Sequence, residues 1–222
     1  MALLIRTLLA TLLALAAALA AAGDARFMAL SYHEVLADDE PLTPTAVRAS
    51  DLARQFAWLQ ANDFHPVSVD QILAARADGP PLPPNAILLT FDDGKKDVYT
   101  RAFPLLTLFG YPAVIALVGK WMDAPPGQMV DYDGEPLPRS DFVTWEQVRE
   151  MQASGLIEVA SHSYDLHHGI IANPQGNTQP AATTRLYANG RYEDDAAYLA
   201  RLRADLRDSI SQHTGRAPRI IV

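Results

Sequence analysis

Two carboxylates and two imidazoles follow directly on short apolar runs of this chain. They are His33, Asp92, Asp93 and His162, and His167 lies five residues after His162. Neutral imidazole is the commonest metal ligand in proteins, and two imidazoles with one carboxylate suit Zn²⁺, Ni²⁺, Fe²⁺ or Co²⁺. A second carboxylate close to such an ion can act as a general base. These residue types therefore indicate a metal-assisted acid–base site.

The paired acids lie in the segment Thr90–Gly94, where Asp92 and Asp93 are adjacent. Neighbouring side chains of a strand point in opposite directions, so one carboxylate can bind a metal ion while the other stays free as a base. The spacing does not say which acid takes which role. The competing interpretation is a strand end at which an aspartate caps the following helix.

The histidine pair, His162 and His167, has a spacing that a straight helix would not place on one face. A strand end that runs into a loop can bring the two rings together. His168 competes with His167 for the second ligand position, and a polar surface loop is the alternative for the whole segment. His33 alone is typical of a hydrogen-bonded histidine, but beside a metal ion its reference pKa of ~6.5 makes it a candidate proton donor.

The elements that must position these residues alternate between strand and helix. Apolar runs that indicate strands lie at 27–32, 86–91, 112–118, 156–160 and 219–222. Helices are expected from a cap at Ser50, over 97–109 with a break at Pro104, from the capping box at Thr144, and over 194–211. This order predicts a parallel α/β architecture, in which the carboxyl ends of the strands form the functional face.

Two longer connections, 122–141 and 169–194, exceed the usual loop length, and such loops are often functional. Trp121, Tyr132 and Tyr164 are candidates for stacking on a sugar ring. Trp145 is expected in the core, and His213 at the solvated end of a helix.

The first 22 residues predict a cleaved secretory signal. A single charge, Arg6, precedes an apolar run that is shorter than the ~20 residues of a spanning helix and ends in small residues. An uncleaved membrane anchor is the alternative. We therefore expect a signal peptide at 1–22, one domain at 23–222, a periplasmic location and no membrane span after removal of the signal. The strand-like run at the end of the chain indicates that this domain is C-terminally incomplete.

Composition excludes several classes of function. The net charge of −8 and the lack of a basic block argue against a nucleic-acid partner. With no cysteine, the chain has no disulfide, no thiolate nucleophile and no cysteine zinc site. No glycine-rich phosphate loop and no G-x-S-x-G elbow are present.

The segment Thr90–Gly94 together with His162 and His167 resembles the polysaccharide deacetylase family, carbohydrate esterase family 4. A wider part of the sequence resembles the exported branch of this family that acts on poly-β-1,6-N-acetyl-D-glucosamine in Gram-negative biofilm systems. This part comprises residues 90–96, 99–106, 144–149 and 158–169. The resemblance implies an incomplete, distorted (β/α) barrel. It also implies one divalent metal ion (Zn, Ni, Fe or Co), an N-acetylglucosamine polymer as substrate and an outer-membrane export partner.

By the same resemblance, Asp93, His162 and His167 match the metal ligands, Asp92 the catalytic base and His33 the catalytic acid. Members of the family continue into a Pro-Tyr-Gly motif that is not found before Val222. Two other functions remain open: deacetylation of another N-acetylated compound, such as chitin, peptidoglycan or a small amide, and a non-catalytic glycan-binding module.

Overall fold

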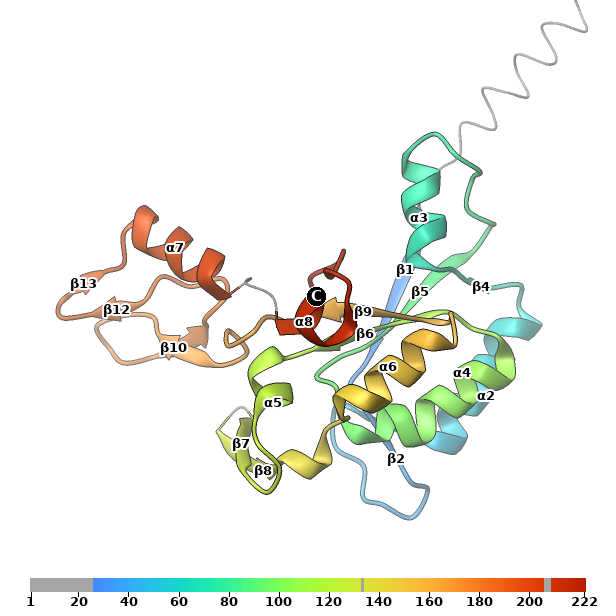
Figure 1. Cartoon of the computed structure of the whole chain (residues 1–222), viewed down its shortest axis with the longest axis horizontal. Coiled ribbons are helices and arrows are strands. Elements are labelled where there is room, and N and C mark those ends of the chain that lie inside the picture. The colour runs from blue at the N-terminus through green and yellow to red at the C-terminus, as the bar shows by residue number, and fades with distance from the viewer. Residues whose placement is uncertain (1–25, 133, 206–208) are drawn as a thin grey trace, which may run out of the picture.

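A parallel sheet with the strand order β1-β5-β6-β9 forms the centre of the molecule, and a short strand, β4, also pairs with β5 (Figure 1). The computed structural model describes residues 26–132, 134–205 and 209–222. The strands of this sheet are β1 (Met28–Tyr32), β4 (His65–Pro66), β5 (Ala86–Phe91), β6 (Ala113–Leu117) and β9 (Ile157–Ser161). All of their pairings are parallel, as the sequence predicts.

The strand β5 is buried along its whole length because helices or other chain segments cover both of its faces. Ile87, Leu89 and Phe91 belong to the larger core cluster, whereas Leu88 belongs to a second cluster on the opposite face. The helices α2 (Ala49–Ala61), α4 (Phe103–Phe109) and α6 (Trp145–Ala153) contribute to the larger cluster and lie together on one side of the sheet (Figure 1). The helix α3 (Val69–Arg76) contributes to the second cluster.

One of the two predicted caps at helix starts is found in the structure. Thr144 and Gln147 form a reciprocal capping box at the start of α6, as predicted. Ser50 does not cap α2: the helix begins one residue earlier, and the Ser50 N–H donates instead to the Asp38 carboxylate at 3.1 Å. The cap is therefore supplied by a side chain twelve residues upstream, which no local pattern indicates.

The helical segment that contains Pro104 is split, as expected from the missing N–H of proline. A short π-helix, η1 (Val98–Ala102), precedes α4, and Pro104 lies in the first turn of α4. Gly110 ends that helix with a φ of +66°, a left-handed conformation that glycine adopts without steric cost.

The remaining elements lie around this framework, and apart from α7 (Asp195–Asp205) they are short. They are β2 (Glu34–Leu36), β3 (Ala46–Arg48), α5 (Gly119–Asp123), β7 (Met129–Tyr132), β8 (Glu135–Pro138), η2 (Arg139–Asp141), β10 (Gly169–Ile171), β11 (Thr178–Pro180), β12 (Tyr187–Ala188), β13 (Arg191–Tyr192), α7 (Asp195–Asp205) and α8 (Ser209–Thr214). The strands from β10 to β13 and the helix α7 form a lobe that extends away from the sheet (Figure 1). The two long connections thus contain small antiparallel hairpins.

Two sequence expectations for the last part of the chain are met only in part. The described residues of the helix expected over 194–211 form α7 and α8, but Leu199 of its expected apolar stripe is 43% exposed. The predicted strand at 219–222 amounts to one parallel bridge between Ser161 and Ile221.

The sheet remains open. In the described ranges β1 and β9 are the two ends of the strand order and do not pair with each other, and Met28 on β1 is 50% exposed. This arrangement confirms the expected incomplete, distorted (β/α) barrel. The expected signal peptide at 1–22 lies outside the described residues. No described helix combines the length and the apolar character needed to cross a bilayer.

Candidate metal centre

The predicted site residues meet at the carboxyl ends of the parallel strands. The Asp92 N–H, which follows β5, donates to the Tyr32 carbonyl at the end of β1 (2.9 Å). The His162 N–H, which follows β9, donates to the Leu117 carbonyl at the end of β6, also at 2.9 Å. These backbone bonds extend the strand pairing by one residue and so place all four strand ends along one rim.

Asp93, His162 and His167 form the centre of the site. The Nε2 atoms of His162 and His167 lie 3.5 and 3.4 Å from Oδ1 of Asp93, and their ring centroids are 4.9 Å apart. One ligand atom from each of the three residues lies within 4.8 Å of the others. The described structure therefore brings together the three predicted ligands, and it selects His167 rather than His168.

The donor set fits a divalent ion. Asp93 is 1% exposed, and its Oδ1 has no hydrogen-bond partner although it faces two imidazole nitrogens. A buried carboxylate oxygen without a partner is costly, and a cation between the three groups would satisfy it. Two imidazoles and one carboxylate are borderline ligands that suit Zn²⁺, Ni²⁺, Fe²⁺ and Co²⁺.

A sharp turn after β5 aims the Asp93 side chain. Asp93 itself has a φ of +72° and Gly94 a φ of +74°. A Cβ atom on Gly94 would lie 2.7 Å from Cδ2 of Leu117, so the Leu117 side chain would have to shift, and the left-handed φ itself favours glycine. Left-handed backbone at a non-glycine residue is sparsely populated and clusters at functional sites.

Asp92 keeps a separate set of contacts. The Ser31 hydroxyl donates to its Oδ2 at 2.7 Å, while Oδ1 is buried without a hydrogen-bond partner. Asp92 thus has one oriented and one free oxygen next to the metal ligands. Half-buried His33 follows β1 on the same rim, but it is not a member of the ligand group.

Asp205, which the sequence reasoning missed, supports the loop that carries both histidines. Its carboxylate accepts the backbone N–H groups of Tyr164 and Asp165 at 2.9 and 2.6 Å, and the residue is 9% exposed. Ser163 in the same loop has a φ of +71°, and its hydroxyl accepts the Leu166 N–H at 3.1 Å. These bonds fold the segment back on itself, so that a five-residue spacing can converge on one point.

The aromatic residues near the site differ from the sugar-stacking expectation. The Tyr132 hydroxyl donates to Oδ2 of Asp93 at 2.6 Å, and Trp121 is 5% exposed with its ring edge-on to His167 at 4.9 Å. Trp145 is half-buried against the core, as expected, but it also stacks on His213 at 4.2 Å. The Nε2 atom of His213 also lies 3.3 Å from Oδ1 of Asp123. His213 is therefore packed against other residues rather than freely solvated.

A small charged cluster lies behind Asp93. Lys95 pairs with Glu34 at 3.5 Å, and both side chains are largely covered. Burial raises the pKa of the nearby Asp97 to about 7. The negative charge of Glu34 also raises this pKa, whereas a hydrogen bond from the Val35 backbone lowers it. Asp97 is therefore an acid that takes up a proton near neutral pH.

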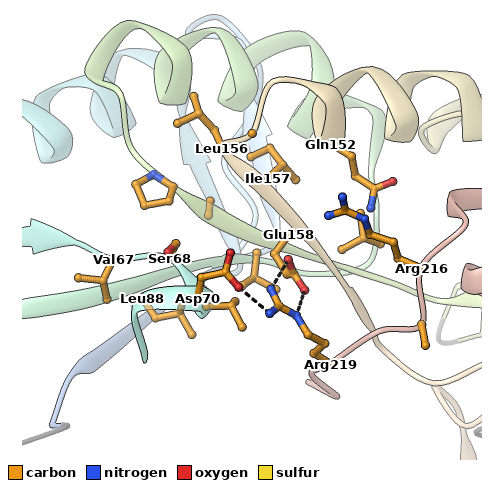
Figure 2. Close-up of a pocket in the computed structure, with 17 residues that line it drawn as sticks. Val67, Ser68, Asp70, Leu88, Gln152, Leu156, Ile157, Glu158, Arg216 and Arg219 are labelled. Atoms are coloured by element: carbon orange, nitrogen blue, oxygen red, sulfur yellow. Dashed lines mark hydrogen bonds and ion pairs between the residues drawn. The ribbon is translucent and has the colours of Figure 1, made fainter. Parts of the chain in front are cut away.

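A pocket of about 650 Å³ opens beside the two histidine ligands and is bordered by the β10–β11 hairpin. A second pocket, of about 570 Å³, lies at the opposite ends of the strands (Figure 2). There Arg219 contacts Glu158 through two bonds of 2.9 Å and Asp70 at 2.6 Å. These acids raise the pKa of the Arg219 guanidinium. The first pocket is lined by both candidate histidine ligands, whereas no candidate metal ligand lines the second.

Comparison with known proteins gives concordant matches. The sequence profile of a family described as Polysaccharide deacetylase matches residues 79–220. The chain is 45% identical over 181 residues to the poly-β-1,6-N-acetyl-D-glucosamine N-deacetylase of Escherichia coli K12, and this match covers 81% of the chain. It covers only 27% of the E. coli protein, so the chain spans little more than a quarter of that relative.

Two solved structures are similar over most of the chain. A de-N-acetylase from Aggregatibacter actinomycetemcomitans superimposes with a TM-score of 0.82 at 41% identity, over 88% of this chain and 78% of that one. The BpsB deacetylase domain from Bordetella bronchiseptica superimposes with a TM-score of 0.78 at 46% identity, over 90% of this chain and 80% of that one.

Proposed function

Because the chain belongs to the polysaccharide deacetylase family, we propose that it removes N-acetyl groups from poly-β-1,6-N-acetyl-D-glucosamine by metal-assisted hydrolysis. The observation that carries this proposal is the convergence of Asp93 Oδ1 with the Nε2 atoms of His162 and His167. The name of the E. coli relative supports this glycan as the substrate. One divalent ion, Zn, Ni, Fe or Co, is the cofactor in this proposal.

When bound, the ion supplies Lewis-acid polarisation of the acetamide carbonyl and of water. Asp92 takes the proton of the attacking water on its free Oδ1, while the Ser31 hydroxyl holds the other oxygen in place. His33, in its protonated form, donates a proton to the leaving glucosamine nitrogen. The products are acetate and a free amine on the glycan.

The setting of the reaction is also a proposal. Residues 1–22 would act as a cleaved secretory signal, and the mature protein would work in the periplasm. There the deacetylated polymer would pass to an outer-membrane export partner. Detection of the mature N-terminus by mass spectrometry of periplasmic extracts tests the signal, and retention of residues 1–22 would contradict it.

The activity is tested by measuring acetate released from β-1,6-linked N-acetylglucosamine oligomers. We expect release by the wild-type protein, loss of release with a chelator, recovery on return of a divalent ion, and no release by Asp93→Asn. The variant Asp39→Asn, which removes an exposed acid away from the site, is the matched control. Full activity of the chelated protein or of Asp93→Asn would refute metal-assisted hydrolysis. Oligomer binding by the wild type without acetate release would show a glycan-binding module instead.

A further inference from the structure

The two oxygens of the Asp93 carboxylate have different partners. Oδ1 faces the Nε2 atoms of His162 and His167 at 3.5 and 3.4 Å, whereas Oδ2 accepts the Tyr132 hydroxyl at 2.6 Å. A bond from a hydroxyl donor to a carboxylate at this distance is short and charge-assisted. The bond from Tyr132 therefore fixes the rotation of the Asp93 carboxylate, which must present a single oxygen to the imidazoles.

Tyr132 is held in place from several sides. It is the last residue of β7, in the hairpin formed by the long connection between β6 and α6. Its ring contacts the rings of Trp121 and Phe142, with centroids 5.1 and 6.2 Å away, and the Lys95 ammonium lies 4.9 Å from its centroid. Because its surroundings fix the ring, the hydroxyl is aimed at Asp93 before any ligand arrives.

We propose that Tyr132 is a positioning residue for the metal ion, acting through Asp93. This inference rests on the proposed metal site. A hydrogen-bond donor on the outer oxygen orients the ligand carboxylate and restricts it to one coordinating oxygen, as outer-shell partners do at metal sites generally. The β7–β8 hairpin thereby belongs to the support of the metal centre, 39 residues along the chain from the carboxylate it orients.

The geometry disfavours the other role that a tyrosine at position 132 suggests, which is stacking on a sugar ring. Sugar stacking needs an accessible ring face. The Tyr132 ring is half-buried, lies under the Lys95 ammonium and stacks on the His167 ring, with centroids 6.4 Å apart and planes at 22°.

The test compares Tyr132→Phe with Tyr99→Phe. Both variants keep the aromatic ring and remove a hydroxyl group that donates to a carboxylate. The Tyr99 hydroxyl donates to Glu150 at 2.7 Å, and Glu150 is not in the ligand group. Zinc affinity is measured by competition with a chromogenic chelator, and the melting temperature of the metal-free protein is recorded for each. We expect Tyr132→Phe to bind zinc about tenfold or more weakly, and Tyr99→Phe to bind it like the wild type.

Zinc affinity of Tyr132→Phe within twofold of the wild-type value would overturn the positioning role and leave the proposed function intact. A rise in KM for the glycan with unchanged zinc affinity would also overturn it, in favour of a sugar platform. If the wild type binds zinc no more tightly than Asp93→Asn does, the proposed metal site is wrong, and this inference is wrong with it.

Discussion

The half-buried acid Asp97 allows a quantitative test of the charged cluster that contains Lys95 and Glu34. Burial and the charge of Glu34 raise its pKa from 3.8 to about 7, and its Oδ1 has no hydrogen-bond partner. The folded state therefore holds the Asp97 proton more tightly than the unfolded state does. The resulting stabilisation is complete below the unfolded pKa of 3.8 and is lost as the pH rises through about 7.

The magnitude follows from the two pKa values. One pKa unit corresponds to 1.36 kcal/mol, so the loss of this stabilisation between pH 5 and pH 8 amounts to about 2.5 kcal/mol. The variant Asp97→Asn does not titrate, and its amide oxygen can still accept the Val35 N–H. We therefore expect the free energy of unfolding of Asp97→Asn to gain about 2.5 kcal/mol on that of the wild type between pH 5 and pH 8.

The assay is urea-induced unfolding of both proteins at pH 5 and pH 8 in the presence of a chelator. Other titrating groups are common to the two proteins, so the difference between them isolates Asp97. Asp39→Asn, which removes an exposed acid, controls for the loss of one charge. An equal change in stability with pH for Asp97→Asn and the wild type would refute the reasoning and would mean that Asp97 is ionised in the folded state at both pH values.

Three further predictions concern the rim of the site. Asp205→Ala removes the acceptor of two part-buried hydrogen bonds from backbone N–H groups, so we expect a loss of about 1–3 kcal/mol in urea unfolding. No loss of stability would contradict the role of Asp205. Gly94→Ala should lower the free energy of unfolding by about 1–2 kcal/mol, because position 94 has a left-handed φ, and it should weaken zinc binding. A variant as stable as the wild type would show that the turn is not strained. His33→Ala should lower the rate of acetate release by about 10²–10⁴-fold with unchanged zinc content, whereas loss of zinc would make His33 a ligand.

The strands and the residues at their ends follow from local sequence. A run such as Ala86–Phe91 is apolar at every position, and only a strand covered on both faces buries all of it. The capping box at Thr144 and the stop at Gly110 depend on neighbouring residues alone, and both are found as predicted. Because parallel strands share a direction, polar residues after several such runs had to meet on one rim.

The choice among these polar residues required the folded chain. Nothing in the spacing distinguishes His167 from His168, and the turn at Asp93 has a left-handed backbone that alternation along a strand does not predict. Tyr132 and Asp205 were not predicted as supports of the site, because each acts on groups about 40 residues away through contacts that leave no local pattern.

The same distinction explains why Leu199 is exposed. The apolar stripe over 194–211 satisfies the periodicity of a helix, but periodicity describes which face would be buried and not whether a partner is there to bury it. Local sequence thus specifies which residues reach the rim, since backbone propensity and apolar patterning act over a few residues. Orientation of the carboxylates and imidazoles depends on side chains brought in from remote parts of the chain, and such contacts exist only once the chain has folded.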